Sequence, residues 1–323
     1  MEKSEVLITI RLHYYRMDAS KLREKLFDVY AAKLSEAIPE IKDTFRCPIC
    51  LKDFDRSALE VDQMLTLGHV IPDALGGLLC TLECGTCNFS IGSAYDSHAS
   101  NMKKFKDWWN MKEGAKKFVR ISMDESTVSA FASWGPKQEL EIRAADWKDP
   151  SYKEQTKKMF TQECKPSFTI HVNSKSIPER VSISTIHSAF LMMFYCFGYE
   201  YILSPEADTI RKIINNREAP WDIRKMLSDI KGLPPFSIPA AGVIREPPDI
   251  RSFIILLPHP ENEEQTRVVF FPGLGSKGAE SFNRFIKLRD KGRGCIDVKM
   301  KVTSEGPSPA GFFRAFWYGQ LPA

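Results

Sequence analysis

Two Cys-x-x-Cys pairs constrain the fold of this chain more than any other feature. The pairs are Cys47-Pro-Ile-Cys50 and Cys84-Gly-Thr-Cys87, and 33 residues separate them. Each pair forms a knuckle whose thiolates face one point, so two knuckles supply the four ligands of a tetrahedral zinc ion. Four thiolates leave no open coordination position, so we expect the zinc to be structural and any chemistry to come from the intervening loop.

The expected cellular compartment decides whether the remaining cysteines form disulfides. No apolar run reaches membrane-spanning length and the N-terminus lacks a signal-peptide pattern, so we expect a cytoplasmic protein with no membrane contact. A reducing compartment disfavours disulfides. The four cysteines outside the pairs are therefore expected to be packed among apolar neighbours: Cys80, Cys164, Cys196 and Cys295.

The distribution of apolar residues predicts an α+β protein, in which a small zinc-stapled module is joined to a larger mixed domain. We expect an N-terminal strand and helix in residues 1–44, the cysteine module with a basic flank in 45–117, and a mixed target-recognition or sensor domain in 118–323. The expected strands are 5–11, 118–123, 128–133, 139–144, 168–174, 252–258, 267–271, 295–302 and 312–319, with helices at 19–38, 184–203, 206–216 and 280–287.

A basic run follows the cysteine module. Between Lys103 and Arg120 seven basic residues face only two acidic ones, in a chain of net charge +4. One interpretation is a solvated helix that packs its aromatic side chains inward, and the other is a flank that contacts nucleic-acid phosphates. The lysines that would make such contacts are Lys103, Lys104, Lys106, Lys112, Lys116 and Lys117.

The order of motifs around the cysteines is specific. A Cys-x-x-Cys pair, the stretch "GHVIPDALGG", a Cys-x-x-Cys-Asn and then Gly92 and Asp96 together resemble the HNH endonuclease family, in its branch with a zinc-stapled ββα-metal module. The resemblance covers about residues 45–100 and continues more weakly through 187–216. It implies a metal-dependent endonuclease that hydrolyses DNA phosphodiester bonds, as in bacterial restriction or anti-phage defence, and that forms a homodimer when it cuts both strands.

The resemblance also implies roles for individual residues. His69 would be the catalytic general base, and Asn88 would be a catalytic residue that binds Mg²⁺ or Mn²⁺ from a helix. The Gly76-Gly77 pair would turn the chain back toward that helix. Asp96 would lie about 12 Å along a continuous helix from Asn88, so we expect it to support the site through a hydrogen bond or a water molecule.

The family commonly places an acidic residue or a histidine directly before the base, whereas this chain has Gly68. Three hypotheses follow: a second ligand from elsewhere, such as Asp62 or Asp73; a weaker site with one ligand; or a module that has lost catalysis. The third makes the protein a zinc-stapled nucleic-acid-binding protein without turnover.

A glycine motif near the C-terminus suggests a different class of site. Gly273, Gly275 and Gly278 have the G-x-G-x-x-G spacing of a dinucleotide site, with Asp297 further along. No series of βα units surrounds the motif, so the sequence favours a simple turn.

Overall fold

The computed structural model describes residues 18–77, 79–123, 126–144, 154, 169–215, 222–231, 239–246, 248–259, 265–275, 277–290, 296–303 and 315–321. The predicted strand at 5–11 and two cysteines, Cys164 and Cys295, lie outside these residues. The predicted α+β class is confirmed, because helices accompany antiparallel sheets throughout the described chain. Within that chain, no helix is long and apolar enough to cross a bilayer.

The chain divides into two compact units. Unit 1 combines residues 1–96 with residues 178–323, and unit 2 consists of residues 97–177. Unit 2 is therefore an insertion in the chain of unit 1, and its limits differ from the expected boundaries at residues 44/45 and 117/118. The difference arises because helix α6, far along the sequence, packs on the cysteine module and makes one core with it.

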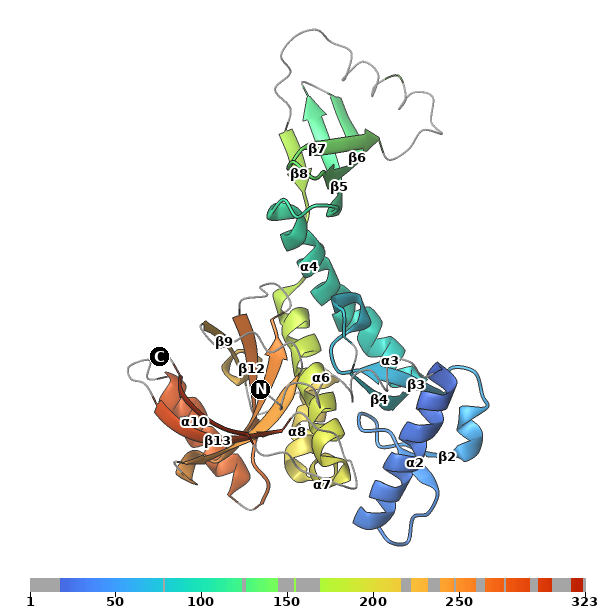
Figure 1. The fold of residues 1–323 in the computed structure, drawn as a ribbon, viewed down its shortest axis with the longest axis vertical. Coiled ribbons are helices and arrows are strands. Elements are labelled where there is room, and N and C mark those ends of the chain that lie inside the picture. Colours follow the sequence, from blue (N-terminus) through green and yellow to red (C-terminus); the bar gives the residue numbers. More distant parts are fainter. Residues whose placement is uncertain are drawn as a thin grey trace, which may run out of the picture. The chain divides into compact units, whose positions relative to one another are not determined.

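The N-terminal part of unit 1 contains one long helix and two small hairpins (Figure 1). Helix α2 (Ala19–Ala37) confirms the expected amphipathic helix, and the Asp18 side chain caps it by accepting a hydrogen bond from the backbone of Ser20. The elements after it are β1 (Thr44–Arg46), β2 (Asp53–Asp55), η1 (Arg56–Leu59), β3 (Leu65–His69), η2 (Asp73–Leu75), β4 (Cys80–Cys84), α3 (Gly85–Ile91) and the π-helical turn η3 (Gly92–Asp96).

The β3–β4 hairpin closes at the glycine pair predicted to turn the chain. Gly76 has φ +82°, a conformation that L side chains rarely adopt. A Cβ on Gly77 would lie 1.8 Å from the carbonyl oxygen of Ile71, so only glycine fits there. This turn returns the chain through β4 directly into α3.

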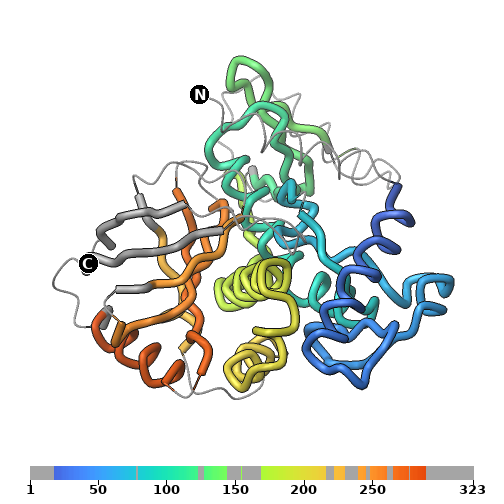
Figure 2. Tube along the Cα trace, turned by 60° about the horizontal axis from the view of Figure 1, so that its bottom comes forward, coloured from blue at the N-terminus to red at the C-terminus, as the bar shows by residue number. Residues whose placement is uncertain are grey.

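Helix α6 (Pro178–Phe197) is the central element of unit 1. Almost all of its side chains from Val181 to Cys196 are buried. On one side it packs on α2, where Tyr30 stacks on Phe194 with ring centroids 4.1 Å apart. Figure 2 shows this helix between the cysteine module and the large sheet.

The helix expected at 184–203 is two helices. Gly198 adopts φ +56° and ends α6, and the chain continues in α7 (Tyr199–Ile202) and α8 (Pro205–Ile214). The break turns Tyr199 and Tyr201 into the core.

Helices cover both faces of a six-stranded antiparallel sheet of order β14-β13-β10-β11-β12-β9. Phe253 and Phe271 are paired across two strands and contact α6 and α7, with Phe197 and Phe253 ring centroids 5.1 Å apart. On the other face Phe270 packs on Phe285 of α10 at 4.5 Å. The remaining elements are α9 (Ile223–Met226), β9 (Leu227–Lys231), β10 (Ala240–Glu246), η4 (Pro248–Ile250), β11 (Ser252–Pro258), β12 (Gln265–Pro272), α10 (Gly278–Asp290), β13 (Ile296–Thr303) and β14 (Ala315–Leu321).

The glycine motif lies between β12 and α10. A Cβ on Gly278 would lie 1.7 Å from the carbonyl oxygen of Gly273, and Gly275 has φ +97°. The motif therefore makes a tight turn that closes on its own backbone. Because β12 pairs antiparallel with both neighbours, the parallel βαβ setting of a dinucleotide site is missing at this strand.

Unit 2 is a helix packed on one face of a four-stranded antiparallel sheet of order β7-β6-β5-β8. Trp108 is buried between them, and its indole nitrogen donates to the carbonyl of Ala132 at 3.1 Å. The elements are α4 (Ser97–Trp109), β5 (Lys116–Met123), β6 (Ser126–Trp134), β7 (Leu140–Ala144) and β8 (Thr169–Val172). The predicted antiparallel meander is thus confirmed.

The basic run is not one helix. Helix α4 ends at Trp109, and positive φ values at Met111 (55°) and Gly114 (76°) turn the chain into β5. Lys116 and Lys117 therefore lie on a strand, where Val119 and Ile121 supply the β-branched side chains that pack well in a sheet.

Candidate functional site

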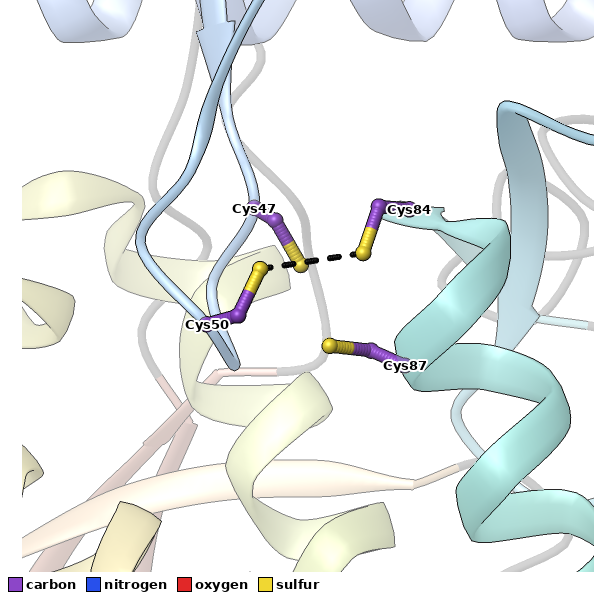
Figure 3. A group of neighbouring side chains, drawn as sticks. All are labelled: Cys47, Cys50, Cys84 and Cys87. Atoms are coloured by element: carbon purple, nitrogen blue, oxygen red, sulfur yellow. Dashed lines mark hydrogen bonds between the residues drawn. The ribbon is translucent and has the colours of Figure 1, made fainter.

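The four predicted zinc ligands lie together. The sulfur atoms of Cys47, Cys50, Cys84 and Cys87 all lie within 4.8 Å of one another, and those of Cys50 and Cys84 are 3.7 Å apart. Figure 3 shows the four side chains pointing toward one centre, two from each knuckle. A tetrahedral zinc ion with bonds of about 2.3 Å needs sulfur atoms about 3.8 Å apart. The cluster therefore fits a metal ion such as zinc.

Backbone geometry and a neighbouring tyrosine hold the first knuckle. The amide of Cys47 donates to the carbonyl of Lys52, and Leu51 adopts φ 59° to close the turn. The Tyr199 hydroxyl donates to the carbonyl of Arg46 at 2.6 Å and accepts from its amide at 2.9 Å. Arg46 also forms a two-point ion pair with Asp53. These contacts tie the knuckle to α7.

Cys80 lies outside the cluster although it is only four residues before Cys84. It is half-buried, and burial together with the charge of Asp73 raises the pKa of its thiol to about 11. Its sulfur is not one of the four that lie within 4.8 Å of one another, so Cys80 is not a ligand of this site. Cys196 is fully buried in α6, as its apolar neighbours predict.

His69 lies on strand β3 and Asn88 on helix α3 of the same hairpin-helix segment. His69 is the last residue of β3 and is half-buried, opposite Cys80 in the hairpin. Asn88 lies in the middle of α3, and its side-chain nitrogen donates to the Thr66 hydroxyl at 3.1 Å and to the Leu67 carbonyl at 3.2 Å. Asn88 thus ties α3 to the strand that ends in His69, although no hydrogen bond joins these two side chains within the described residues.

A carboxylate from the neighbouring strand fills the space beside Gly68. A Cβ on Gly68 would lie 2.2 Å from Oε2 of Glu83, which is fully buried on β4. Thr66 and Glu83 are paired in the hairpin, so Glu83 and Gly68 lie on the same face. Oε2 of Glu83 has no hydrogen-bond partner within the described chain. The side-chain position that the sequence leaves empty at residue 68 is therefore occupied by an acidic group.

Glu83 belongs to a buried polar cluster with α6. Its Oε1 lies 3.2 Å from Nε2 of His187, and the Ser184 hydroxyl donates to Asp96 at 2.6 Å. Burial alone would lower the pKa of His187. The charge and hydrogen bond of Glu83, together with the charge of Asp96, outweigh this effect, so the pKa of His187 is raised above its ordinary value. Burial raises the pKa of Asp96. The cluster thus places the Glu83 carboxylate beside the His187 ring, with a second carboxyl group, Asp96, near them.

Neither Glu83 nor His187 is among the site residues predicted from the sequence. One signal for Glu83 was available, because a lone acidic residue interrupts the apolar pattern of "CTLEC" directly before a zinc ligand. His187 had no comparable signal within its apolar helix. The two carboxylates considered as substitutes for a ligand at residue 68, Asp62 and Asp73, are both exposed.

The predicted nucleic-acid-binding lysines are spread over different surfaces of unit 2. Lys103 and Lys112 both form ion pairs with Asp107, at 3.4 and 3.7 Å. Lys117 lies over the Phe105 ring at 5.5 Å, and burial followed by the charges of Lys104 and Lys175 lowers its pKa. The three other predicted lysines are Lys104 and Lys106 on α4 and Lys116 on β5.

Comparison with protein-family models, with curated proteins and with solved structures finds no match for this chain.

We predict one zinc ion per chain, bound by the four clustered thiols. Cys84→Ser should release the metal and lower the free energy of unfolding by roughly 3–5 kcal/mol, because the two knuckles lose their link. Cys80→Ser is the matched control, since it removes a thiol from the same strand outside the cluster. Elemental analysis and chemical denaturation test this, and full zinc content in Cys84→Ser would contradict it.

We predict that Glu83 and His187 stabilise unit 1 jointly. Glu83→Gln and His187→Gln should each lower the free energy of unfolding by about 1–3 kcal/mol, and the double variant should cost roughly 1–2 kcal/mol less than their sum. The exposed pair of Glu179 and Arg224, 2.8 Å apart, is the control and should show a coupling near zero. Equal couplings in the two pairs would contradict the prediction.

Proposed function

We propose that unit 1 contains an HNH-type endonuclease centre that hydrolyses DNA phosphodiester bonds with a divalent metal ion. The observation that carries the proposal is the order hairpin, then helix, with His69 ending the first strand and Asn88 on the helix. Cys84 and Cys87 attach this ββα segment to the sulfur cluster at the junction of β4 and α3. This is the arrangement that the family resemblance implies.

We propose two oxygen atoms as ligands of the catalytic metal. Mg²⁺ and Mn²⁺ prefer oxygen ligands, and Glu83 offers a buried carboxylate oxygen that lacks a partner within the described chain. The Asn88 amide nitrogen is directed at Thr66 and Leu67, so its carbonyl oxygen is the amide atom suited to a cation. When bound, the ion stabilises negative charge on the phosphate and on the leaving oxygen.

His69 is suited to activate water. Its imidazole would accept a proton as the water oxygen bonds to phosphorus, while the bond from phosphorus to the leaving sugar oxygen breaks and that oxygen takes up a proton. The side chain is half-buried, so solvent and substrate can reach it.

A second candidate function is nucleic-acid binding without turnover. The ion pair of Glu83 with His187 favours it, because the carboxylate charge is already balanced without a metal ion. The basic and aromatic residues of unit 2 serve this function equally well.

We predict that the protein nicks supercoiled plasmid in Mg²⁺ or Mn²⁺. His69→Ala should lower the rate by about 10²–10⁴-fold, the usual contribution of a general base, while plasmid binding persists. Glu83→Ala should also abolish nicking, whereas Asp62→Asn and Asp73→Asn should not change it. A double variant, Gly68→Asp with Glu83→Ala, moves the carboxylate from β4 to β3. It should restore part of the activity if a carboxylate at this place in the hairpin is what the reaction needs.

The possible outcomes separate the cleavage function from the binding function and test the role of each residue. Nicking that survives His69→Ala would refute the assignment of the base. Nicking that needs Asp62 or Asp73 instead of Glu83 would refute the assignment of the metal ligand. Plasmid binding without nicking in any divalent metal would favour the binding function.

A further inference from the structure

The outer face of the unit 2 sheet exposes two aromatic rings at its centre. Phe118 and Phe131 are paired across β5 and β6, with ring centroids 5.4 Å apart in an edge-to-face arrangement. Their exposed fractions are 48% and 36%, whereas the apolar side chains on the opposite face of the same strands are buried and pack on Trp108 near the end of α4. A considerable apolar area therefore faces solvent on this surface.

Basic side chains surround the two rings. Lys116 lies over the Phe131 ring, with its ammonium nitrogen 4.6 Å from the centroid. Arg143 is paired with Phe131 from β7, and Arg120 lies two residues from Phe118 on the same face of β5. Glu141 lies on this face as well and forms an ion pair with Arg143 at 3.2 Å.

Histidine and hydroxyl groups extend the face toward β8. His171 is paired with Arg120 in the register, and its Nε2 lies 3.1 Å from the Ser122 hydroxyl. The outer face therefore combines two open rings, three cations and several hydrogen-bonding groups on a flat surface.

A purely structural role accounts for only part of this arrangement. A cross-strand aromatic pair stabilises a sheet, but it does so by covering its rings, and these rings remain substantially open. A second copy of the same face is also a poor partner, because it would place Lys116, Arg120 and Arg143 against identical charges.

We propose that this outer face, centred on Phe118 and Phe131, binds single-stranded nucleic acid. Unpaired bases can stack on exposed aromatic rings, and the surrounding cations can contact the phosphates. This inference goes beyond the cleavage proposed for unit 1 and does not depend on it.

A duplex fits this surface less well than a single strand. Strands in a sheet lie about 4.8 Å apart, so the outer strands of this sheet are separated by roughly 14 Å. The major groove of B-DNA is about 12 Å wide, and the bases of a duplex are stacked on one another. A duplex would contact the cations alone and leave the two rings unused.

The test measures binding of the full chain carrying His69→Ala, so that cleavage cannot confuse the result. Fluorescence anisotropy would compare a labelled 15-nucleotide DNA strand, the RNA strand of the same sequence and the 15-base-pair DNA duplex, in buffer without divalent metal. We expect at least tenfold tighter binding of a single strand than of the duplex. Comparison of the two single strands shows whether the face prefers DNA or RNA.

Matched variants separate ring stacking from charge and from folding. Phe118→Leu and Phe131→Leu keep an apolar side chain without the ring and should each weaken single-strand binding about tenfold, whereas Phe118→Tyr should retain it. Arg120→Gln should reduce the dependence of binding on salt, whereas Lys103→Gln, on α4 beside Asp107, should not. Thermal unfolding of each variant confirms that the fold is intact.

Two results would overturn the proposal. One is equal affinity for duplex and single strand that does not change in the Phe→Leu variants. The other is stronger, Phe-dependent binding of vesicles made of anionic lipid, which would assign the face to a membrane surface. Because plasmid nicking is measured separately, failure of the cleavage proposal leaves this result readable, and the reverse also holds.

Discussion

The convergence of four sulfur atoms is the constraint on which the cysteine module depends. Its β1 and β2 strands have three residues each, and β3 and β4 form an isolated pair. Two-stranded hairpins are at best marginally stable in water. A metal ion bound by Cys47, Cys50, Cys84 and Cys87 would link both hairpins to α3. Helix α6 packs on this module with apolar side chains. The position of His69 at the end of β3 follows from this scaffold.

The second feature that organises unit 1 is a buried charge. Glu83 is fully buried, and a lone carboxylate there would be costly, so its neighbours must compensate. His187 does this from α6, and Gly68 provides the space because it has no side chain. The glycine and the glutamate are thus parts of one arrangement. What seemed to be a missing group at residue 68 is an acidic group supplied from β4.

Local features of the fold could be predicted from the sequence, and long-range ones could not. Periodicity located α2, and the paired cysteines and the glycine turn located the hairpin, because each depends on neighbouring residues. The structure of the basic run was harder to predict, because the helix ends where residues adopt positive φ values, and composition does not specify where these occur. Glu83 and His187 are 104 residues apart, and no periodicity connects them. Asn88 was placed by its motif, but its bond to Leu67 required the structure.

The insertion of unit 2 has a consequence for how such a chain can change. Both of its ends are fastened: the Ile177 amide donates to His98 within unit 2, and Ser184 donates to Asp96 within unit 1. The chain therefore leaves the core and returns to it through adjacent points. Unit 2 could therefore be replaced as a whole during evolution, while the sulfur cluster and the buried charges of unit 1 stay the same.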